Sequence, residues 1–375
     1  MISSPSTEKT LRRGYTTGAC AQAAAVAAAS TSGSAPSAGE VVVRLPGGET
    51  ARFAYRLDGD GTAWVVKDAG DDPDITDGLA IGVRVEDTPG VFAVKAGEGV
   101  GTVTLPGLAV PPGEPAVNPV PREAVLAELR RLRPGGATAT ILAPGGEELA
   151  RRTLNPRLGI VGGISILGTT GRVEPWSVEA MRASLLPQLA VAAALGRTDL
   201  VFVLGAKGRH LAVEAGADER DVVETANEIG WMLERAAERG FHSVTVRGHV
   251  GKLVKLAAGI FDTHSRVADA RLVTLAAYAG AGGLPAAEVR RILAMNTADQ
   301  AAAHLLGLGR GDVLVEVAEA AARACRDRYG LPVGVTLLDR DGGLLAAAPF
   351  DADSAGGGGM SVSGGGMSAG REERP

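Results

Sequence analysis

The chain has 375 residues, of which 45% are hydrophobic, 22% charged and 3% aromatic, and its 38 basic and 43 acidic residues give a net charge of −5. This acidic balance argues against bulk binding to nucleic acid, which needs a net basic face, and no run of about 20 strongly apolar residues predicts a membrane span. The two cysteines, Cys20 and Cys325, lack the spacing of a metal or redox site and suit a reducing cytosol.

The stretch Leu11–Ser30, LRRGYTTGACAQAAAVAAAS, allows two interpretations. Two arginines followed by an apolar run resemble a twin-arginine export signal. The same letters can also form a loop that leads into a helix, with Thr16 and Thr17 at its start. The run Ala19–Ala29 favours the helix, because it is interrupted by Gln22 and is rich in Ala, the residue with the highest helix propensity.

The rest of the first half is predicted to consist mainly of strands and turns. Glu40–Leu57 has two β-branched runs around a Pro-Gly-Gly turn, which predicts a hairpin. A helix is expected at Arg122–Leu132. The segments Ala137–Pro144 and Glu147–Asn155 suggest another strand pair, and Ser177–Leu195 suggests a helix with Ser177 as its N-cap.

In the second half, predicted strands alternate with predicted helices, which indicates a parallel sheet covered by helices. Thr198–Gly208 is expected to form a strand and a glycine turn, Glu219–Gly240 an amphipathic helix, and His242–Gly259 a strand, a glycine turn and a helix. A last hairpin should turn at residues 341–343. Further helices are expected at residues 265–279, 286–295, 298–306 and 312–329.

These patterns predict a domain boundary near residue 196, between a first half of mainly strands and turns and a second half with a parallel sheet. Residues 351–375 are mostly Gly, Ser, Met and charged residues. Such a segment buries too little apolar surface to offset its chain entropy, so it is predicted to be a disordered tail.

Several glycine-rich stretches are candidate ligand loops. Gly97–Thr102 resembles a dinucleotide fingerprint but is followed by Val-Thr-Leu-Pro instead of a helix, so a turn between strands is expected. In Gly159–Pro175, the residues Gly162, Gly163, Thr169 and Thr170 could either bind a ligand or form a plain linking turn.

Two further glycine turns follow predicted strands of the second half. They contain Gly205 and Gly208 in one case and Gly248 and Gly251 in the other. Ligands of α/β sheets bind at the carboxyl ends of the strands, where glycine lets a ligand approach the backbone.

The segment Phe261–Arg271 contains Asp262, Thr263, His264 and Ser265 just before a predicted helix. Asp262 and His264 could perform acid–base chemistry. Alternatively, Thr263 or Ser265 caps the helix, and the residues alone favour this alternative. The chain has no HExxH motif and no Cys/His cluster, so no protein-built metal site is predicted.

Taken together and in this order, these motifs resemble the CbiD family. The matching segments span about residues 11–300 and are the following: RRGYTTGACAQAAA, GEGVGTVTLPGL, GEPAVNPVPR, NPRLGIVGGISILGTTGRVEPWS, GHVGKLVKLAAGIFDTHSRVADAR and NTADQA. The resemblance implies a CbiD-like two-domain fold, with an α+β N-terminal domain at residues 1–196 and an α/β C-terminal domain with a small parallel sheet at residues 197–350. It also implies a methyltransferase of anaerobic cobalamin biosynthesis. The implied reaction carries a methyl group from S-adenosylmethionine to carbon 1 of cobalt-precorrin-5B and gives cobalt-precorrin-6A. It also implies that the TTG segment stays in the mature, cytoplasmic enzyme.

On this interpretation the site residues have three roles. Asp262 and His264 are the candidate catalytic pair, as base or orienting pair. The residues that would hold S-adenosylmethionine are Gly162, Gly163, Thr169, Thr170, Gly205, Gly208, Gly248 and Gly251. Cobalt arrives only as part of the substrate. The carboxylates of the tetrapyrrole call for cationic and hydroxyl anchors, and the candidates are Arg12, Arg13, Thr16, Thr17, His249 and Lys252.

Two rival functions stay open at this stage, a non-catalytic corrinoid-binding protein and a nucleotide-phosphate enzyme that uses the glycine loops. Titration with S-adenosylmethionine, ATP and a corrinoid separates them. The expected partner is the tetrapyrrole, with no nucleic acid and no membrane, and a homo-oligomer is compatible with the sequence.

Overall fold

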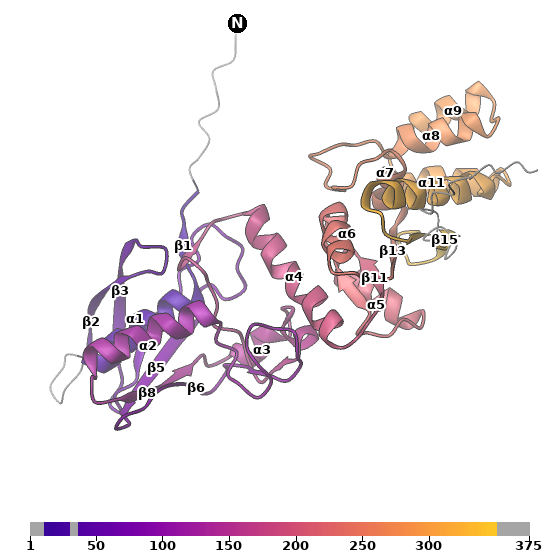
Figure 1. Ribbon diagram of the computed structural model, residues 1–375. Helices are drawn as coiled ribbons and strands as arrows, with labels where there is room; N and C mark the ends of the chain where they lie inside the picture. Colours follow the sequence, from indigo (N-terminus) through magenta and orange to yellow (C-terminus); the bar gives the residue numbers. More distant parts are fainter. Residues whose placement is uncertain (1–10, 31–36, 351–375) are drawn as a thin grey trace, which may run out of the picture. The chain divides into compact units, whose positions relative to one another are not determined.

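The computed structural model describes residues 11–30 and 37–350, so the predicted tail at 351–375 lies outside the described residues. The chain divides into two compact units. The first contains the residues up to Arg197 together with Asp218–Glu224, and the second contains Thr198–Ala217 and the residues from Thr225 on. Both units mix helices with sheets (Figure 1).

The first unit is built on a six-stranded sheet in which all neighbours are antiparallel except β8 and β6, which are parallel. Its order is β2 (Ala38–Arg44), β3 (Thr50–Leu57), β4 (Ala63–Val66), β5 (Ala80–Asp87), β8 (Ala137–Leu142) and β6 (Phe92–Ala96). The predicted hairpin is confirmed as β2 and β3, which pair from Ala38 with Arg56 to Arg44 with Thr50.

Helix α1 (Thr17–Ser30) packs against this sheet and against α2 (Pro119–Leu132). Its residues from Thr17 to Ala29 are all buried. Ten of the fourteen residues of α1 are Ala, Gly or Cys, so neighbouring elements can approach the helix on every side. The predicted helix is confirmed. Because the helix is part of the core, removing it as an export signal would take away a large part of that core.

The first unit has further elements outside this sheet and its two helices. They are β1 (Gly14–Tyr15), which pairs with β10 (Arg172–Val173), β7 (Thr102–Val103), which pairs with β9 (Ile160–Val161), α3 (Gly146–Ala150), a 3₁₀ turn at Asn155–Leu158, α4 (Val178–Ala194) and β12 (Val222–Glu224). The strand predicted at Glu147–Asn155 is wrong, because Glu147 and Glu148 occupy the first turn of α3, where acidic side chains are favourable.

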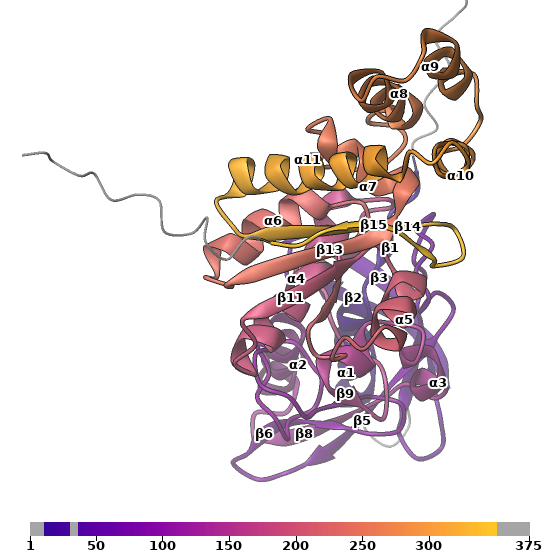
Figure 2. The same cartoon turned by 90° about the vertical axis from the view of Figure 1, so that its right-hand side faces the viewer.

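The second unit contains strands β11 (Asp199–Val203), β13 (Ser243–His249), β14 (Val333–Leu338) and β15 (Leu344–Ala348), adjacent in that order. The first three are parallel, and β15 is antiparallel to β14. Helix α11 (Gly311–Tyr329) lies along β14 and β15 and packs on α7 (Val250–Ala257) (Figure 2). This confirms the predicted alternation of strands and helices around a parallel sheet.

The remaining helices are α5 (Ala206–Glu214), α6 (Ile229–Glu238), α8 (Arg271–Ala281), α9 (Ala286–Leu293) and α10 (Ala298–Gly307). Two predicted helices begin too early. In Glu219–Gly240 the first ten residues form turns and β12, where Val222 and Val223 are buried. The helix predicted from Ser265 begins at Arg271. Within the described ranges, no helix is long and apolar enough to span a membrane.

Candidate functional site

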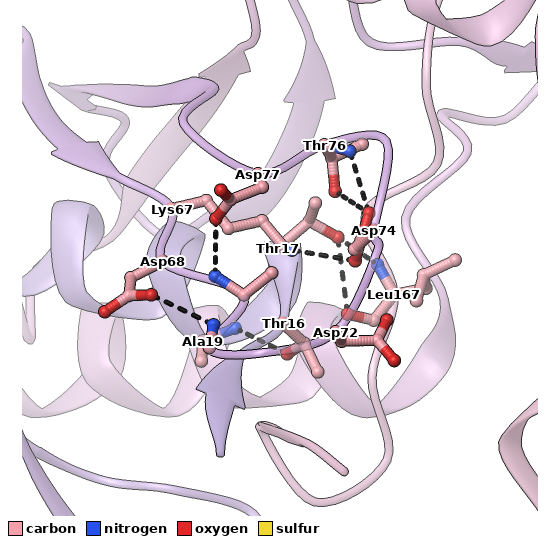
Figure 3. A network of polar contacts seen from close by, with 12 residues as sticks. Thr16, Thr17, Ala19, Lys67, Asp68, Asp72, Asp74, Thr76, Asp77 and Leu167 are labelled. Atoms are coloured by element: carbon pink, nitrogen blue, oxygen red, sulfur yellow. Dashed lines mark hydrogen bonds and ion pairs between the residues drawn. The ribbon is translucent and has the colours of Figure 1, made fainter. Parts of the chain in front are cut away.

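The start of α1 is joined to the glycine-rich loop at residues 162–171. The Thr17 hydroxyl accepts a hydrogen bond from the Leu167 N–H at 2.9 Å, and the Gly18 N–H donates to the Leu167 carbonyl at 3.0 Å (Figure 3). Gly168 has φ +128°, and a Cβ there would lie 2.3 Å from the Thr16 hydroxyl oxygen. The structure therefore brings together two motifs about 150 residues apart in sequence.

The other loop residues differ in how much room surrounds them. A Cβ on Gly163 would lie 2.1 Å from the Gly99 carbonyl oxygen, so this glycine serves close packing. A Cβ on Gly162 would meet nothing within 4 Å. Thr169 and Thr170 are exposed, and the Thr170 hydroxyl accepts from the Arg172 N–H at 3.2 Å. Gly162 and Thr169 are thus the loop residues most open to a ligand.

The two arginines before α1 are held in exposed ion pairs. Arg12 pairs with Asp68, and Arg13 Nε lies 2.9 Å from Glu174 Oε2. The hydrogen bond from Arg12 lowers the pKa of Asp68, with a further contribution from the Gly70 N–H. Exposed pairs of this kind contribute little to stability, so a substrate carboxylate could replace either acidic partner.

The loop between β4 and β5 is rich in aspartate and lies next to these arginines, because its Asp68 pairs with Arg12. This loop was not identified as part of the site from the sequence. Lys67 is 1% exposed and donates to Asp74 at 2.7 Å, while Asp77 accepts from the Ala69 N–H at 2.7 Å (Figure 3). Burial tends to raise the pKa of Asp74, but the hydrogen bonds and charge of Lys67 and the Thr76 hydrogen bonds outweigh it, so this pKa is lowered. The signal was present as five aspartates in the ten residues 68–77.

In the second unit, Gly205 lies between the end of β11 and the start of α5. Its backbone is extended, and a Cβ there would meet nothing within 4 Å. Gly208 was predicted in the same turn, but the structure places it inside α5, where a Cβ would lie 3.2 Å from the Val203 Cβ. Gly205 therefore offers open backbone at the strand end, and Gly208 serves the packing of α5 on β11.

Close packing also explains why glycine occupies positions 248 and 251. Gly248 belongs to β13, and a Cβ there would lie 2.4 Å from Leu204 Cδ1. Gly251 belongs to α7, and a Cβ there would lie 3.0 Å from the His249 ring. The glycine turn predicted between β13 and α7 is absent, since α7 follows β13 directly.

His249 is the N-cap of α7, and both of its ring nitrogens are engaged. Nδ1 accepts from the Gly251 N–H at 3.2 Å, and Nε2 lies 2.9 Å from Asp299 Oδ2. Because Nδ1 accepts, the ring proton lies on Nε2 and points to Asp299. Asp299 also accepts the Arg340 N–H at 3.0 Å. In this geometry His249 fixes the ends of β13, α10 and β14, and a ligand would have to displace one of these bonds to reach the ring.

The Asp262–His264 segment forms a turn and not a helix cap. Ala270 is the N-cap of α8, so the capping interpretation of Thr263 and Ser265 is wrong. Asp262 Oδ1 accepts the His264 N–H at 2.9 Å, and His264 Nδ1 accepts the Arg266 N–H at 3.1 Å. The neutral His264 ring therefore carries its proton on Nε2, which suits it to donate a hydrogen bond rather than to remove a proton at that atom.

Beside this turn lies a polar cluster of Asn227, Lys252, Lys255 and Thr263. Lys252 Nζ donates to Asn227 Oδ1 at 2.9 Å, and Lys255 Nζ donates to the Thr263 carbonyl at 3.0 Å. Lys252 was predicted from the sequence, and Lys255 lies in the same GHVGKLVKLAAG motif, whereas Asn227 was missed. Only the fold makes Asn227 visible, because no charge run or motif marks it. Within the described residues, no group of three or more His, Cys, Asp or Glu side chains could hold a metal ion.

Comparison with known proteins covers almost the whole chain. The family described as CbiD matches residues 4–175, and the family described as CbiD, C-terminal domain, matches residues 262–349. The chain is 46% identical over 346 residues to a protein of Moorella thermoacetica, covering 89% of this chain and 94% of that one. It is 43% identical over 353 residues to a protein of a Thermoanaerobacter species, covering 91% and 96%. Both relatives are named cobalt-precorrin-5B C(1)-methyltransferase.

A crystal structure of the cobalamin biosynthesis protein cbiD from Archaeoglobus fulgidus is also similar. It is 28% identical in sequence, covers 68% of this chain and 83% of its own, and gives a TM-score of 0.39.

Proposed function

Because this chain belongs to the CbiD family, we propose that it is a cobalt-precorrin-5B C(1)-methyltransferase, which adds a methyl group to carbon 1 of the tetrapyrrole and gives cobalt-precorrin-6A. The observation that carries this proposal is the 38–46% identity to relatives of this name over most of both chains. A corrinoid-binding protein without catalysis or a nucleotide-phosphate enzyme is disfavoured by the same similarity.

The methyl donor we propose is S-adenosylmethionine. In the reaction, an electron pair of the macrocycle forms the new bond to the methyl carbon, while the C–S bond breaks and its pair stays on sulfur. The product is a neutral thioether, so positive charge is lost from sulfur as the reaction proceeds. A carboxylate against the sulfur would stabilise the reactant more than the transition state. Positioning donor and acceptor in line is therefore the main task of the chain, and it can be worth up to about 7–11 kcal/mol.

We propose that the donor binds at the carboxyl end of β11, next to Gly205. Ligands of parallel sheets occupy this edge, and the backbone of Gly205 is open to an approaching group. The loop at residues 162–171 is the alternative, because Gly162 is equally open. The two units then correspond to the α+β and α/β domains expected for the family, with a boundary near residue 196.

For the tetrapyrrole, we propose the exposed Arg12 and Arg13 as carboxylate anchors, with Thr16 and Thr17 shaping the loop beside them. The Thr17 hydroxyl is hydrogen-bonded to the Leu167 N–H, and Thr16 Oγ1 accepts the Ala19 N–H at 3.2 Å. Both threonines therefore act by positioning the backbone and not by direct contact with the ligand. His264 Nε2–H is the group of the Asp262 turn that can donate to a ligand.

We also propose that the chain keeps its N-terminal segment and works in the cytoplasm. The support is α1, whose residues form part of the core of the first unit. Fractionation of the producing cells with sequencing of the N-terminus tests this, and a periplasmic protein shortened near Ala38 would contradict it.

The activity is tested with purified protein, cobalt-precorrin-5B and methyl-labelled S-adenosylmethionine. The expected product is one methyl group heavier and carries the label at carbon 1. Transfer to nitrogen, to oxygen or to another ring carbon would refute the assignment.

A further inference from the structure

Two lysines on one face of α7 converge on a single carbonyl oxygen. Lys252 and Lys255 are three residues apart, and their Nζ atoms lie 3.3 Å and 3.0 Å from the Thr263 carbonyl oxygen. Lys252 also donates to the Asn227 side-chain oxygen at 2.9 Å. Every acceptor that the structure gives for these two ammonium groups is thus a neutral amide oxygen.

This cationic pair is buried without a counter-ion. Lys255 is 2% exposed and Thr263 is fully buried, while Lys252 is half-buried. Among the described residues, no carboxylate lies within 4.0 Å of either ammonium group, whereas the other buried lysine, Lys67, has Asp74 at 2.7 Å. The nearby acids have other partners, because Asp262 binds the His264 N–H and Asp269 is paired with Arg271. Burying positive charge without an anion is costly, so this arrangement favours the binding of an anion.

Backbone strain at the same place is an independent sign of function. Ala226 has φ +50°, and only one other non-glycine residue in the described part of the chain has a positive φ. Such a conformation costs about 1–3 kcal/mol and persists where the surroundings impose it, often at ligand sites. Here it places Asn227, whose side chain accepts from both Lys252 and the Thr263 hydroxyl.

We propose that Lys252 and Lys255 bind one carboxylate group of a ligand of this enzyme, with Lys252 making the contact and Lys255 supplying charge from behind it. The proposal rests on the proposed function, because both of its ligands carry carboxylates: the methyl donor has one in its amino-acid part, and the tetrapyrrole has several. Either source supplies the same chemistry, and the experiment distinguishes them.

Binding of an anion here has a proton linkage. Burial, and then the charge of Lys252, lower the pKa of Lys255, with Arg271 acting in the same direction and Asp269 and Asp262 opposing. A bound carboxylate favours the charged amine and raises this pKa, so binding takes up a proton in the pH range between the two values. The affinity should therefore fall as the pH rises through the lowered pKa.

The test is calorimetric titration of the full chain with three ligands. S-adenosylhomocysteine carries the amino-acid carboxylate, 5′-methylthioadenosine lacks it, and cobyrinic acid is a stable cobalt corrinoid with free carboxylates. The proteins are the wild type, Lys252→Met, Lys255→Met and the control Lys95→Met, which removes an exposed lysine of β6. Each titration is repeated in two buffers of different ionisation enthalpy, which measures the protons taken up.

If the site binds the carboxylate of the donor, Lys252→Met should weaken the binding of S-adenosylhomocysteine at least about tenfold, or about 1.4 kcal/mol. The affinity for 5′-methylthioadenosine should then stay unchanged. If the site binds a carboxylate of the tetrapyrrole, Lys252→Met should weaken only the binding of cobyrinic acid. In both cases Lys255→Met should abolish the proton uptake. Wild-type affinity of the folded Lys252→Met protein for all three ligands would overturn the inference, and binding of none of them by the wild type would instead overturn the proposed function.

Discussion

At the scale of single residues, glycines that look alike in sequence have different roles in the structure. Gly205 and Gly208 both follow a buried strand, but only Gly205 has open space around its Cα, whereas Gly208 packs on Val203 inside α5. A ligand and a neighbouring side chain both require a missing Cβ, so the sequence cannot separate these reasons. Asn227 was missed for a related reason, because its partners Lys252 and Thr263 lie 25 and 36 residues away in sequence.

This difference predicts that two substitutions change different properties, ligand affinity in one case and stability in the other. Gly205→Val should weaken S-adenosylmethionine binding about tenfold or more, about 1.4 kcal/mol, with little change in stability, because the side chain enters the space proposed for the donor. Gly208→Val should lower the melting temperature through its contact with Val203 and leave the affinity of the folded fraction unchanged. Calorimetry and thermal melts measure both effects. Normal affinity of Gly205→Val would move the donor site to the loop at residues 162–171.

Trp176 is a second residue whose conformation leads to a prediction. It has φ +58°, the residue is 70% exposed, and its N–H donates to Asp72 at 3.0 Å. An aromatic residue in this backbone region is strained by about 1–3 kcal/mol. Trp176→Gly should therefore raise the free energy of unfolding by about 1 kcal/mol relative to Trp176→Ala, which keeps the strain. Urea denaturation measures the difference, and a marked loss of stability in both variants would show that the indole packs.

At the scale of elements, the sequence predicted segments with one regular pattern well and the boundaries inside mixed segments poorly. The hairpin of β2 and β3, helices α1, α4 and α11, and the strands β11 and β13 all lie where their patterns indicated. The segment Glu219–Gly240 failed because the buried Val222 and Val223 fit a helical repeat as well as a short strand. Tertiary contacts decide such cases, and a local pattern does not contain them.

Helix α1 predicts a strong response to side-chain size. Ala24 is fully buried between the sheet and α2, so Ala24→Leu adds three carbons where no room exists and should cost about 1–3 kcal/mol. Ala127→Leu, on the exposed side of α2, is the matched control and should change stability by less than about 0.5 kcal/mol. The free energy of unfolding measures both. Equal small effects would mean that α1 is loosely packed.

The loop between β4 and β5 predicts a pH effect. Asp74 has a lowered pKa in the folded protein, so its pairing with the buried Lys67 stabilises the fold above the unfolded pKa of about 3.9. This contribution is lost as the pH falls through the lowered value. Asp74→Asn should cost about 3 kcal/mol at pH 7, because it leaves Lys67 without its anion. Stability measured from pH 7 to pH 3 should fall less steeply in the variant than in the wild type, and parallel curves would contradict this account.

At the scale of the whole molecule, the two compact units each contain one buried cysteine. Cys20 lies in α1 and Cys325 in α11, and the side chains of both are fully buried. Burial raises the pKa of each thiol to about 12. Since only the thiolate reacts, both cysteines should be inert in the folded chain, and each reports the opening of its own unit.

We therefore expect no labelling of either thiol in native buffer at pH 7.5 and two separate labelling transitions in urea. Cys20 should become reactive together with the change in Trp64 fluorescence, which reports the first unit, and Cys325 together with that of Trp231, which reports the second. Cys20→Ala and Cys325→Ala assign the signals, and Trp→Phe variants assign the fluorescence. Two units with separate cores can unfold at different urea concentrations, because nothing requires their stabilities to match. If both cysteines, Trp64 and Trp231 instead respond in one transition in every variant, the chain unfolds as a single cooperative body, and the division into two units does not extend to its energetics.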